Sequence, residues 1–323
     1  MVATGAGRRV ASAYRRAGAD TPFGDPRRAH GVAMEGYYWR FSDAASGRAV
    51  VALCGVCRAA DGVWAVVALA AEPGGFTRWA NTERAWADAD RLGVAAFDGE
   101  RAVLRGSDRR LVVDLGEDAR LEAVLEGRAE WPRRALGGLG LGQAVPGLPQ
   151  YWHPHLLHAR VRGQAVLGRD TWSLDGFGGY GEKNWGGAFP GVWWWGQVGF
   201  GDGAMAAFAG GRLRGPLAAT AVVARAGDEM AALAPPGALV VAEAAAGEWR
   251  IRARSPRWTV TLEGERQAAP HVLPVPVPAE RRSELRSEHH LAGAMRAELR
   301  RGRRVLLRAE SGVAGLELGT PGG

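Results

Sequence analysis

Cysteine is scarce in this sequence, and long apolar runs are missing. The only two cysteines are Cys54 and Cys57, too few for a framework of disulfides. No apolar stretch approaches the ~20 residues that a membrane-spanning helix needs. Four arginines within residues 1–19 interrupt any hydrophobic segment of a secretion signal. We therefore expect a mature chain that is not exported and that works in the cytoplasm.

Lysine is almost absent as well. Of the 41 basic residues only Lys183 is a lysine, and the chain has only two asparagines, Asn81 and Asn184. This bias is typical of a GC-rich genome in which arginine replaces lysine wherever only the charge matters. The persistence of Lys183 then indicates a site that needs a compact ammonium instead of a planar guanidinium. The alternative is chance survival on the surface.

The positive charge is concentrated in two segments. Residues 1–30 and 280–304 each carry a net charge of +4, and aromatic residues are rare in both. A nucleic-acid binder would show aromatic residues interleaved with a basic stripe, so we expect no nucleic-acid partner. The basic segments are either solvated ends or points of weak attraction to an anionic membrane surface. No feature of the sequence points to a particular oligomeric state.

Alternation of apolar and polar residues with period 2 predominates and predicts β-strands. Strands are expected at 249–254 and 258–262, and hairpins at 48–58 with 63–70 and at 295–300 with 304–309. Glycine and proline separate these short strands. The pattern predicts an all-β fold with few helices, built from antiparallel sheets that are closed or nearly closed so that edges are removed.

The composition also suggests a division of the chain. Residues 131–150 are rich in Gly, Leu and Pro without periodicity and are interpreted as a linker. This predicts an N-terminal β domain at 23–130 and a C-terminal β domain at 151–323. Residues 1–22, rich in Ala, Arg and Gly, are expected to form a flexible basic arm.

Several motifs that often carry chemistry have unfavourable contexts here. Cys54 and Cys57 have CxxC spacing but lie in an apolar strand, where residues three apart point to opposite faces. His153 and His155 would share a strand face while His158 points away, which is poor geometry for a metal site. The glycines of 138–142 have no strand before them and no helix after them. We predict no metal site and no cofactor.

Aromatic residues are concentrated in one region. Six of the thirteen tryptophans fall within residues 152–195. The run Trp193, Trp194 and Trp195 must present rings to both faces of a strand. The cluster is either a large hydrophobic core or a pocket with π faces that binds an aromatic or isoprenoid ligand.

Residues 180–190 read YGEKNWGGAFP and are followed by WWWGQ at 193–197. This stretch closely resembles the signature of the tocopherol cyclase family. Residues 35–40, EGYYWR, are similar to that family's N-terminal segment, and 146–151 and 311–319 fall where related segments are expected. The resemblance spans residues 23–319. It implies a pair of lipocalin-like β-barrel or half-barrel domains, and an activity that closes a chromanol ring on a prenylated hydroquinone without metal or redox cofactor.

The resemblance also implies the site residues. The catalytic candidates are Tyr180, Glu182, Lys183 and Asn184. The substrate-binding candidates are Glu35, Tyr37, Trp39, Trp185, Phe189, Trp193, Trp194, Trp195 and Gln197. The expected partner is a hydrophobic small molecule of the prenylated aromatic or isoprenoid class.

Ring closure requires protonation of an alkene, which is a very weak base. The site needs a positioned acid, aromatic faces that stabilise the cation, and few loose waters. Glu182 in a pocket walled by tryptophan has the chemistry of that acid, with a pKa raised by burial. In a strand, Tyr180, Glu182 and Asn184 share one face, and Lys183 and Trp185 share the other. One set lines the pocket and the other anchors it.

Two alternatives remain open at this stage. The chain differs from the family pattern at Gly191-Val192 and Val198-Gly199, and its nearest acidic residue before the signature is Asp175. A hydratase of isoprenoid double bonds would use the same cation but let water capture it. A non-catalytic lipocalin-like lipid carrier would use the pocket without the chemistry.

Overall fold

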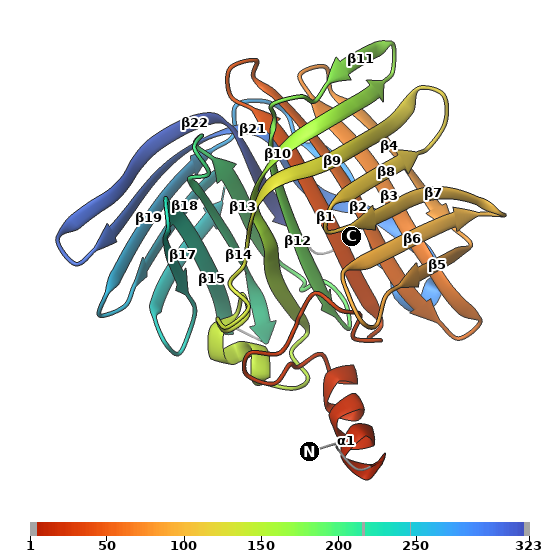
Figure 1. Cartoon of the computed structure of the whole chain (residues 1–323), viewed down its shortest axis with the longest axis horizontal. Helices are drawn as coiled ribbons and strands as arrows, with labels where there is room; N and C mark the ends of the chain where they lie inside the picture. The colour runs from red at the N-terminus through yellow and green to blue at the C-terminus, as the bar shows by residue number, and fades with distance from the viewer. Residues whose placement is uncertain (1–4, 215–216, 246, 320–323) are drawn as a thin grey trace.

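The computed structural model describes residues 5–214, 217–245 and 247–319. The fold is two large antiparallel sheets, each strongly curved, that lie side by side (Figure 1). The predicted all-β class is confirmed. The predicted strands at 249–254 and 258–262 and both predicted hairpins are also confirmed.

The first sheet is built by the N-terminal part of the chain, in the order β4-β3-β2-β1-β12-β10-β9-β8-β7-β6-β5, with β11 paired to β10. Because β5 returns to lie against β3, the sheet forms a nearly closed barrel. Its strands are β1 Met34–Asp43, β2 Arg48–Ala59, β3 Gly62–Glu72, β4 Phe76–Thr82, β5 Arg84–Ala87, β6 Gly93–Asp98, β7 Arg101–Ser107, β8 Arg110–Asp114, β9 Ala119–Glu130, β10 Gln150–Leu167, β11 Asp170–Ser173 and β12 Gly178–Gly186.

The second sheet has the order β16-β15-β14-β13-β22-β21-β19-β18-β17, with β20 paired to β21. It curls in the same way, since β17 lies against β15. Its strands are β13 Trp193–Gly199, β14 Met205–Arg214, β15 Leu217–Ala226, β16 Glu229–Leu233, β17 Leu239–Ala245, β18 Glu248–Arg254, β19 Trp258–Glu265, β20 His271–Val277, β21 Arg282–Arg301 and β22 Arg304–Gly319.

Apolar clusters fill the interior of each sheet and the space between the two sheets. Each sheet encloses its own core, around Trp39 and Phe41 in the first and around Phe208 and Trp249 in the second. A third cluster lies between the sheets and includes Tyr38, Trp152, Tyr180 and Trp195. The space between the sheets is therefore an interface with side chains from both.

The division between the sheets differs from the predicted domain boundary. The segment 131–150 joins β9 to β10, which are adjacent strands of the first sheet, and the chain passes to the second sheet only at 187–192. The Gly/Pro-rich composition of 131–150 marks an irregular surface loop, and such loops occur within a sheet as readily as between domains. It contains the 3₁₀ helix η1, Gly140–Ala144.

Within the predicted flexible arm, residues 17–20 contact the first sheet and the loop that precedes β10. Helix α1, Gly5–Arg16, lies at one end of the molecule (Figure 1). Beyond it, Ala19 and Asp20 are buried, and Trp185 Nε1 donates a hydrogen bond to the carbonyl oxygen of Gly18 at 2.7 Å. Residues 1–4 of the arm lie outside the described residues. No helix within the described ranges is long and apolar enough to cross a bilayer.

Candidate active site

A pocket with a volume of about 570 Å³ lies between the two sheets. Strands β1, β10 and β12 of the first sheet supply one wall, and β13, β21 and β22 of the second sheet supply the other. The loop that contains η1 lies at its mouth, where Leu141 and Val145 are both lining and exposed. The lining is mainly apolar and aromatic, with a small number of polar groups, which is the usual composition of a small-molecule site.

Strand β12 presents its motif to two different environments. Glu182 pairs across the strands with Tyr38, and Asn184 pairs with Trp152, so these side chains share the face toward the pocket. Lys183 and Trp185 pair with Tyr37 and Glu35 on the opposite face. The alternation predicted for the motif is therefore confirmed, and the Glu182 face is the one that lines the pocket.

Glu182 is held by three hydrogen bonds to a single oxygen. Its Oε2 accepts from the Tyr180 hydroxyl at 2.6 Å and from the indole nitrogens of Trp152 and Trp195 at 2.8 Å each. Its Oε1 has no hydrogen-bond partner among the described residues, and Glu182 lines the pocket. Burial raises the pKa of Glu182 to about 7, against the opposing effect of the three donors. The carboxyl is thus fixed in orientation and balanced between its two protonation states near neutral pH.

A second carboxyl lies in the pocket wall formed by the other sheet. Glu317 Oε1 accepts hydrogen bonds from Ser287 Oγ at 2.7 Å and from Trp193 Nε1 at 2.8 Å. Its Oε2 lies 3.6 Å from His289 Nδ1, and His289 Nε2 lies 3.1 Å from the Tyr38 hydroxyl. Burial raises the pKa of Glu317 and lowers that of His289 far below its usual value.

Sequence reasoning missed this second group. Its members come from three strands, β1, β21 and β22, that are distant in sequence. Tyr38 and Glu317 do fall within segments 35–40 and 311–319, which resemble the tocopherol cyclase family. That resemblance was the only available signal, and it pointed to the neighbours Tyr37 and Trp39 of the opposite strand face.

Lys183 lies in a buried ion pair on the face of β12 opposite to the pocket. Its Nζ is 2.8 Å from Glu35 Oε2 and donates to the Arg28 carbonyl oxygen at 2.6 Å. Both side chains of the pair are almost completely buried. Burial lowers the pKa of Lys183, an effect that Glu35 partly offsets. Burial also acts to raise the pKa of Glu35, but the charge and hydrogen bond of Lys183 together with the backbone N–H of Gly31 lower it overall.

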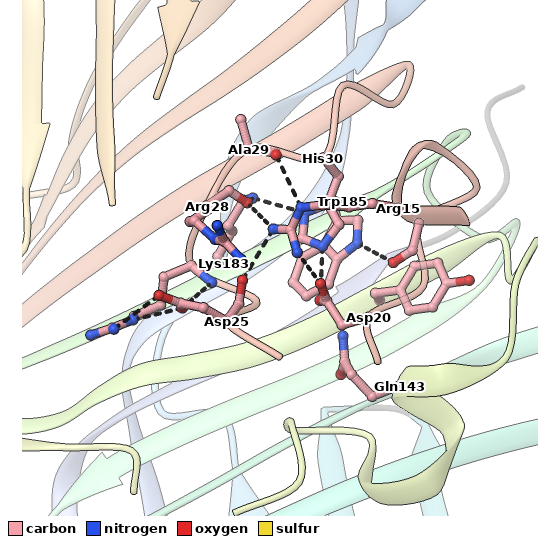
Figure 2. A network of polar contacts seen from close by, with 12 residues as sticks. Arg15, Asp20, Asp25, Arg28, Ala29, His30, Gln143, Lys183 and Trp185 are labelled. Carbon is pink, nitrogen blue, oxygen red and sulfur yellow. Dashed lines mark hydrogen bonds and ion pairs between the residues drawn. The ribbon is translucent and has the colours of Figure 1, made fainter. Parts of the chain in front are cut away.

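His30 connects this ion pair to the N-terminal segment (Figure 2). Its Nδ1 is 3.2 Å from Lys183 Nζ, its Nε2 is 2.9 Å from Asp20 Oδ2, and its ring stacks on Trp185 at 4.1 Å. Burial and the nearby cations lower the pKa of His30, so the ring is neutral and accepts from Lys183 while donating to Asp20. Arg15 pairs with the other oxygen of Asp20. This network orders the segment that precedes β1.

The remaining predicted residues divide between the pocket and its supports. The pocket is lined by Asn184, Phe189, Trp193, Trp194 and Trp195, and Tyr37 borders it although its side chain packs into the core of the first sheet. Trp194 also packs into the core of the second sheet, so the three consecutive tryptophans serve both faces of β13 as predicted. Trp39, Trp185 and Glu35 lie on the other side of β1 and β12, outside the pocket.

Gln197 is part of a contact between the sheets. Its Oε1 accepts a hydrogen bond from Arg40 at 3.0 Å, and Arg40 also donates to the carbonyl oxygens of Leu291 and Val313. Arg40 is buried, and burial lowers its pKa to about 10. A Cβ on Gly315 would lie 2.8 Å from Arg40 Nε, so the side chain passes through a space that only glycine leaves open.

The cysteine and histidine motifs lie in buried parts of the first sheet. Cys54 and Cys57 are buried free thiols, and burial raises the pKa of Cys57 to about 12. His153 and His155 are buried beside the interior of the first sheet, where burial lowers their pKa values. No group of three or more His, Cys, Asp or Glu side chains in the described ranges is arranged to hold a metal ion.

Comparisons with known proteins agree with the fold. Kievitone hydratase from Nectria haematococca superposes with a TM-score of 0.51 at 9% identity, covering 88% of each chain. A Nitrosomonas europaea protein assigned as an AttH superposes with a TM-score of 0.51 at 11% identity, covering 90% of this chain and 93% of that chain. At such identities the likeness concerns the fold alone, and it confirms the predicted lipocalin-like architecture.

Two comparisons concern the sequence. No curated protein sequence matches the chain. The family model described as tocopherol cyclase-like matches residues 140–320, more than half of the chain and including the whole EKNWG motif. The chain therefore belongs to the tocopherol cyclase-like family.

Proposed function

We propose that this protein closes a chromanol-type ring on a prenylated hydroquinone or a related isoprenoid lipid by acid catalysis, with Glu182 as the proton donor. The observation that carries the proposal is the state of the Glu182 carboxyl. It is fixed through Oε2 by three donors, it lines an aromatic pocket, and its pKa is raised to about 7. A general acid works best when its pKa lies near the working pH.

The proposed step transfers the Glu182 proton to one carbon of the prenyl double bond. The other carbon becomes a tertiary cation, and the neighbouring phenol oxygen forms a C–O bond to it. The hydroxyl proton is then released, so the product has the same mass as the substrate. Because Oε2 is occupied by its donors, Oε1 is the oxygen that carries the transferred proton.

The walls of the pocket suit a carbocation. The rings of Trp195 and Tyr38 meet edge to face at 5.1 Å beside Glu182, and Trp193 packs against Phe189 at 4.9 Å. When a positive charge is shielded from water, each aromatic face in contact with it stabilises it by about 2 kcal/mol or more. The mainly apolar lining also limits the water that would quench the cation.

The mouth of the pocket supports a lipid substrate delivered from a membrane surface. Leu141, Val145 and Leu213 line the pocket and are 54%, 47% and 39% exposed. Tyr14 of α1 donates to the Ala144 carbonyl oxygen, which places the exposed Arg16 end of that helix beside the loop. Apolar side chains next to basic ones suit peripheral contact with anionic lipid.

The test is incubation of the purified protein with prenylhydroquinones of several tail lengths in D₂O, followed by mass spectrometry. We expect a chromanol that carries one non-exchangeable deuterium on carbon, because the proton on Glu182 exchanges with solvent. Glu182→Gln abolishes the reaction, whereas Glu310→Gln, an exposed site on β22, does not. Tight ligand binding with no product at any tail length would contradict the proposal and support a lipid carrier.

A hydratase is the second candidate. The polar group at Ser287, His289 and Glu317 offers partners for a water molecule, and one structural neighbour is a hydratase by name. Water capture of the same cation adds one water to the product mass, whereas cyclisation leaves the mass unchanged. The same incubation therefore separates the two reactions.

A further inference from the structure

We propose that the Tyr38 hydroxyl is a second catalytic group, which accepts the proton lost by the attacking hydroxyl, and that His289 and Glu317 position and support it. The inference deepens the proposed function and rests on it. It applies to both capture reactions, because a phenol and a water each lose one proton when the new C–O bond forms.

The geometry forms a continuous path across the pocket. The Tyr38 hydroxyl is 3.1 Å from His289 Nε2, and the two rings stack at 5.8 Å. His289 Nδ1 is 3.6 Å from Glu317 Oε2, an ion-pair distance that a small movement would shorten to a hydrogen bond. Tyr38, His289 and Glu317 all line the pocket.

The neighbours of His289 determine which of its two ring nitrogens carries the proton. Glu317 is an acceptor on the Nδ1 side, so the neutral ring carries its proton on Nδ1. That leaves Nε2 as an acceptor for the Tyr38 hydroxyl. Ser287 and Trp193 both donate to Glu317 Oε1, which fixes the carboxyl and leaves Oε2 facing the ring.

The proton transfers balance. Glu182 gives its proton to carbon and becomes a carboxylate. As the C–O bond forms, the proton of the attacking hydroxyl passes to the Tyr38 oxygen while the proton of Tyr38 passes to His289 Nε2. The resulting imidazolium lies beside Glu317. Tyr38 is the cross-strand partner of Glu182, so return of the proton to Glu182 along this side of the pocket resets the site.

Glu182 alone is poorly placed for both roles. Its Oε2 already accepts three hydrogen bonds, and its Oε1 faces the carbon that it has just protonated. A separate acceptor lets the C–O bond form without waiting for that carboxylate to move. General acid and base groups each contribute about 10² to 10⁴ in rate.

The first arm of the test needs no substrate. In protein labelled with ¹⁵N-histidine, we expect the His289 signals to show a proton on Nδ1 and a hydrogen-bonded Nε2. Tyr38→Phe keeps the ring against Trp195 and should move the Nε2 signal to that of a free acceptor. His289→Gln assigns the signal, and His290→Gln, whose ring packs on Trp249 outside the pocket, leaves it unchanged. If the Nε2 signal of His289 is the same in Tyr38→Phe as in the wild type, the hydrogen bond is absent and the proposal is refuted.

The second arm measures turnover of a prenylhydroquinone. We expect Tyr38→Phe and His289→Gln to lower kcat by about 10²-fold or more, with KM changed by about threefold at most. Glu317→Gln lowers kcat less, since it acts through His289, and His290→Gln keeps the kcat of the wild type. Wild-type turnover retained in Tyr38→Phe would refute the second catalytic group while the proposed function stands. A wild-type protein without turnover would refute the proposed function, and the first arm would still decide the hydrogen bond.

Discussion

Glu182 and Lys183 are adjacent in sequence, yet their side chains leave β12 on opposite faces and share no hydrogen-bond or ion-pair partner among the described residues. Glu182 is bound by Tyr180, Trp152 and Trp195, whereas Lys183 is bound by Glu35, Arg28 and His30. An ammonium close to Glu182 would lower its pKa and remove the acid form. The strand separates the two charges, so burial dominates at Glu182.

The contribution of Glu182 to the stability of the protein should fall as the pH rises from about 5 to about 7. The pKa of Glu182 is raised to about 7, so the folded state holds a proton that the unfolded state releases near its ordinary value. Its contribution is therefore complete at low pH and is lost as the pH rises through about 7. Glu182→Gln lacks this dependence. Between pH 5 and pH 8 its free energy of unfolding should therefore rise by about 2 kcal/mol relative to that of the wild type.

Urea unfolding at the two pH values measures this gain. Glu310→Gln, exposed on β22, is the matched control and should follow the wild type. Equal pH dependence in the wild type and in Glu182→Gln would mean that the carboxyl is ionised throughout.

Turnover should have the same dependence on the protonated carboxyl. Only the acid form of Glu182 can protonate an alkene, so kcat should fall by about tenfold per pH unit above about 7. A pH profile of kcat with a prenylhydroquinone measures it. A profile that rises between pH 6 and pH 9 would assign the rate-limiting step to a base instead of an acid.

Lys183→Arg should destabilise the protein by about 1 kcal/mol or more, although every other basic residue of the chain is arginine. The ammonium lies between Glu35 and the Arg28 carbonyl oxygen, with the Tyr37 and Trp185 rings 5.4 and 5.0 Å away, so a planar guanidinium does not fit. Lys183→Met leaves Glu35 unpaired and should lose about 3 to 5 kcal/mol.

Adding Glu35→Gln to Lys183→Met removes the unpaired charge and should recover part of that loss. Thermal and urea unfolding of the wild type, Lys183→Met, Glu35→Gln and the double variant gives the coupling energy. A Lys183→Arg protein with the wild-type Tm would show that the single lysine is an accident of drift.

The sequence predicted the strands and the two faces of β12 because period-2 alternation and the motif both depend on local order. It could not predict which face meets the pocket, since that depends on where the second sheet lies. It also could not predict that residues 131–150 connect two adjacent strands of the first sheet, because strand order is a matter of long-range pairing. The Tyr38, His289 and Glu317 group was missed for the same reason. Its members meet only when β1, β21 and β22 come together.

Arg40→Met should destabilise the contact between the sheets. The guanidinium donates to Gln197 and to the carbonyl oxygens of Leu291 and Val313, all of them in the second sheet. Removing it leaves these buried acceptors without a donor, at a cost of about 1 to 3 kcal/mol each. Calorimetry measures the loss, and Arg78→Met, at an exposed position on β4, is the control. An unchanged Tm would mean that water replaces the guanidinium.

Contact with membranes is tested at the pocket mouth. Leu141→Ser with Leu213→Ser should weaken binding to vesicles that contain anionic lipid by about thirtyfold, because each exposed leucine contributes about 1 kcal/mol on insertion. Leu239→Ser is the control, since Leu239 is even more exposed than Leu141 and Leu213 but lies on β17 and does not line the pocket. Co-sedimentation measures binding. Equal losses in all variants, or no binding by the wild type, would refute the contact.

Each sheet encloses an apolar core of its own, and the pocket occupies the layer between them. Substitutions that reshape the pocket therefore leave most of the packing that sustains either barrel untouched. A lineage with this architecture is free to exchange pocket side chains, and so to acquire new ligands, at little risk to folding. Divergence of chemistry within a constant scaffold is the evolutionary outcome that such a layout favours.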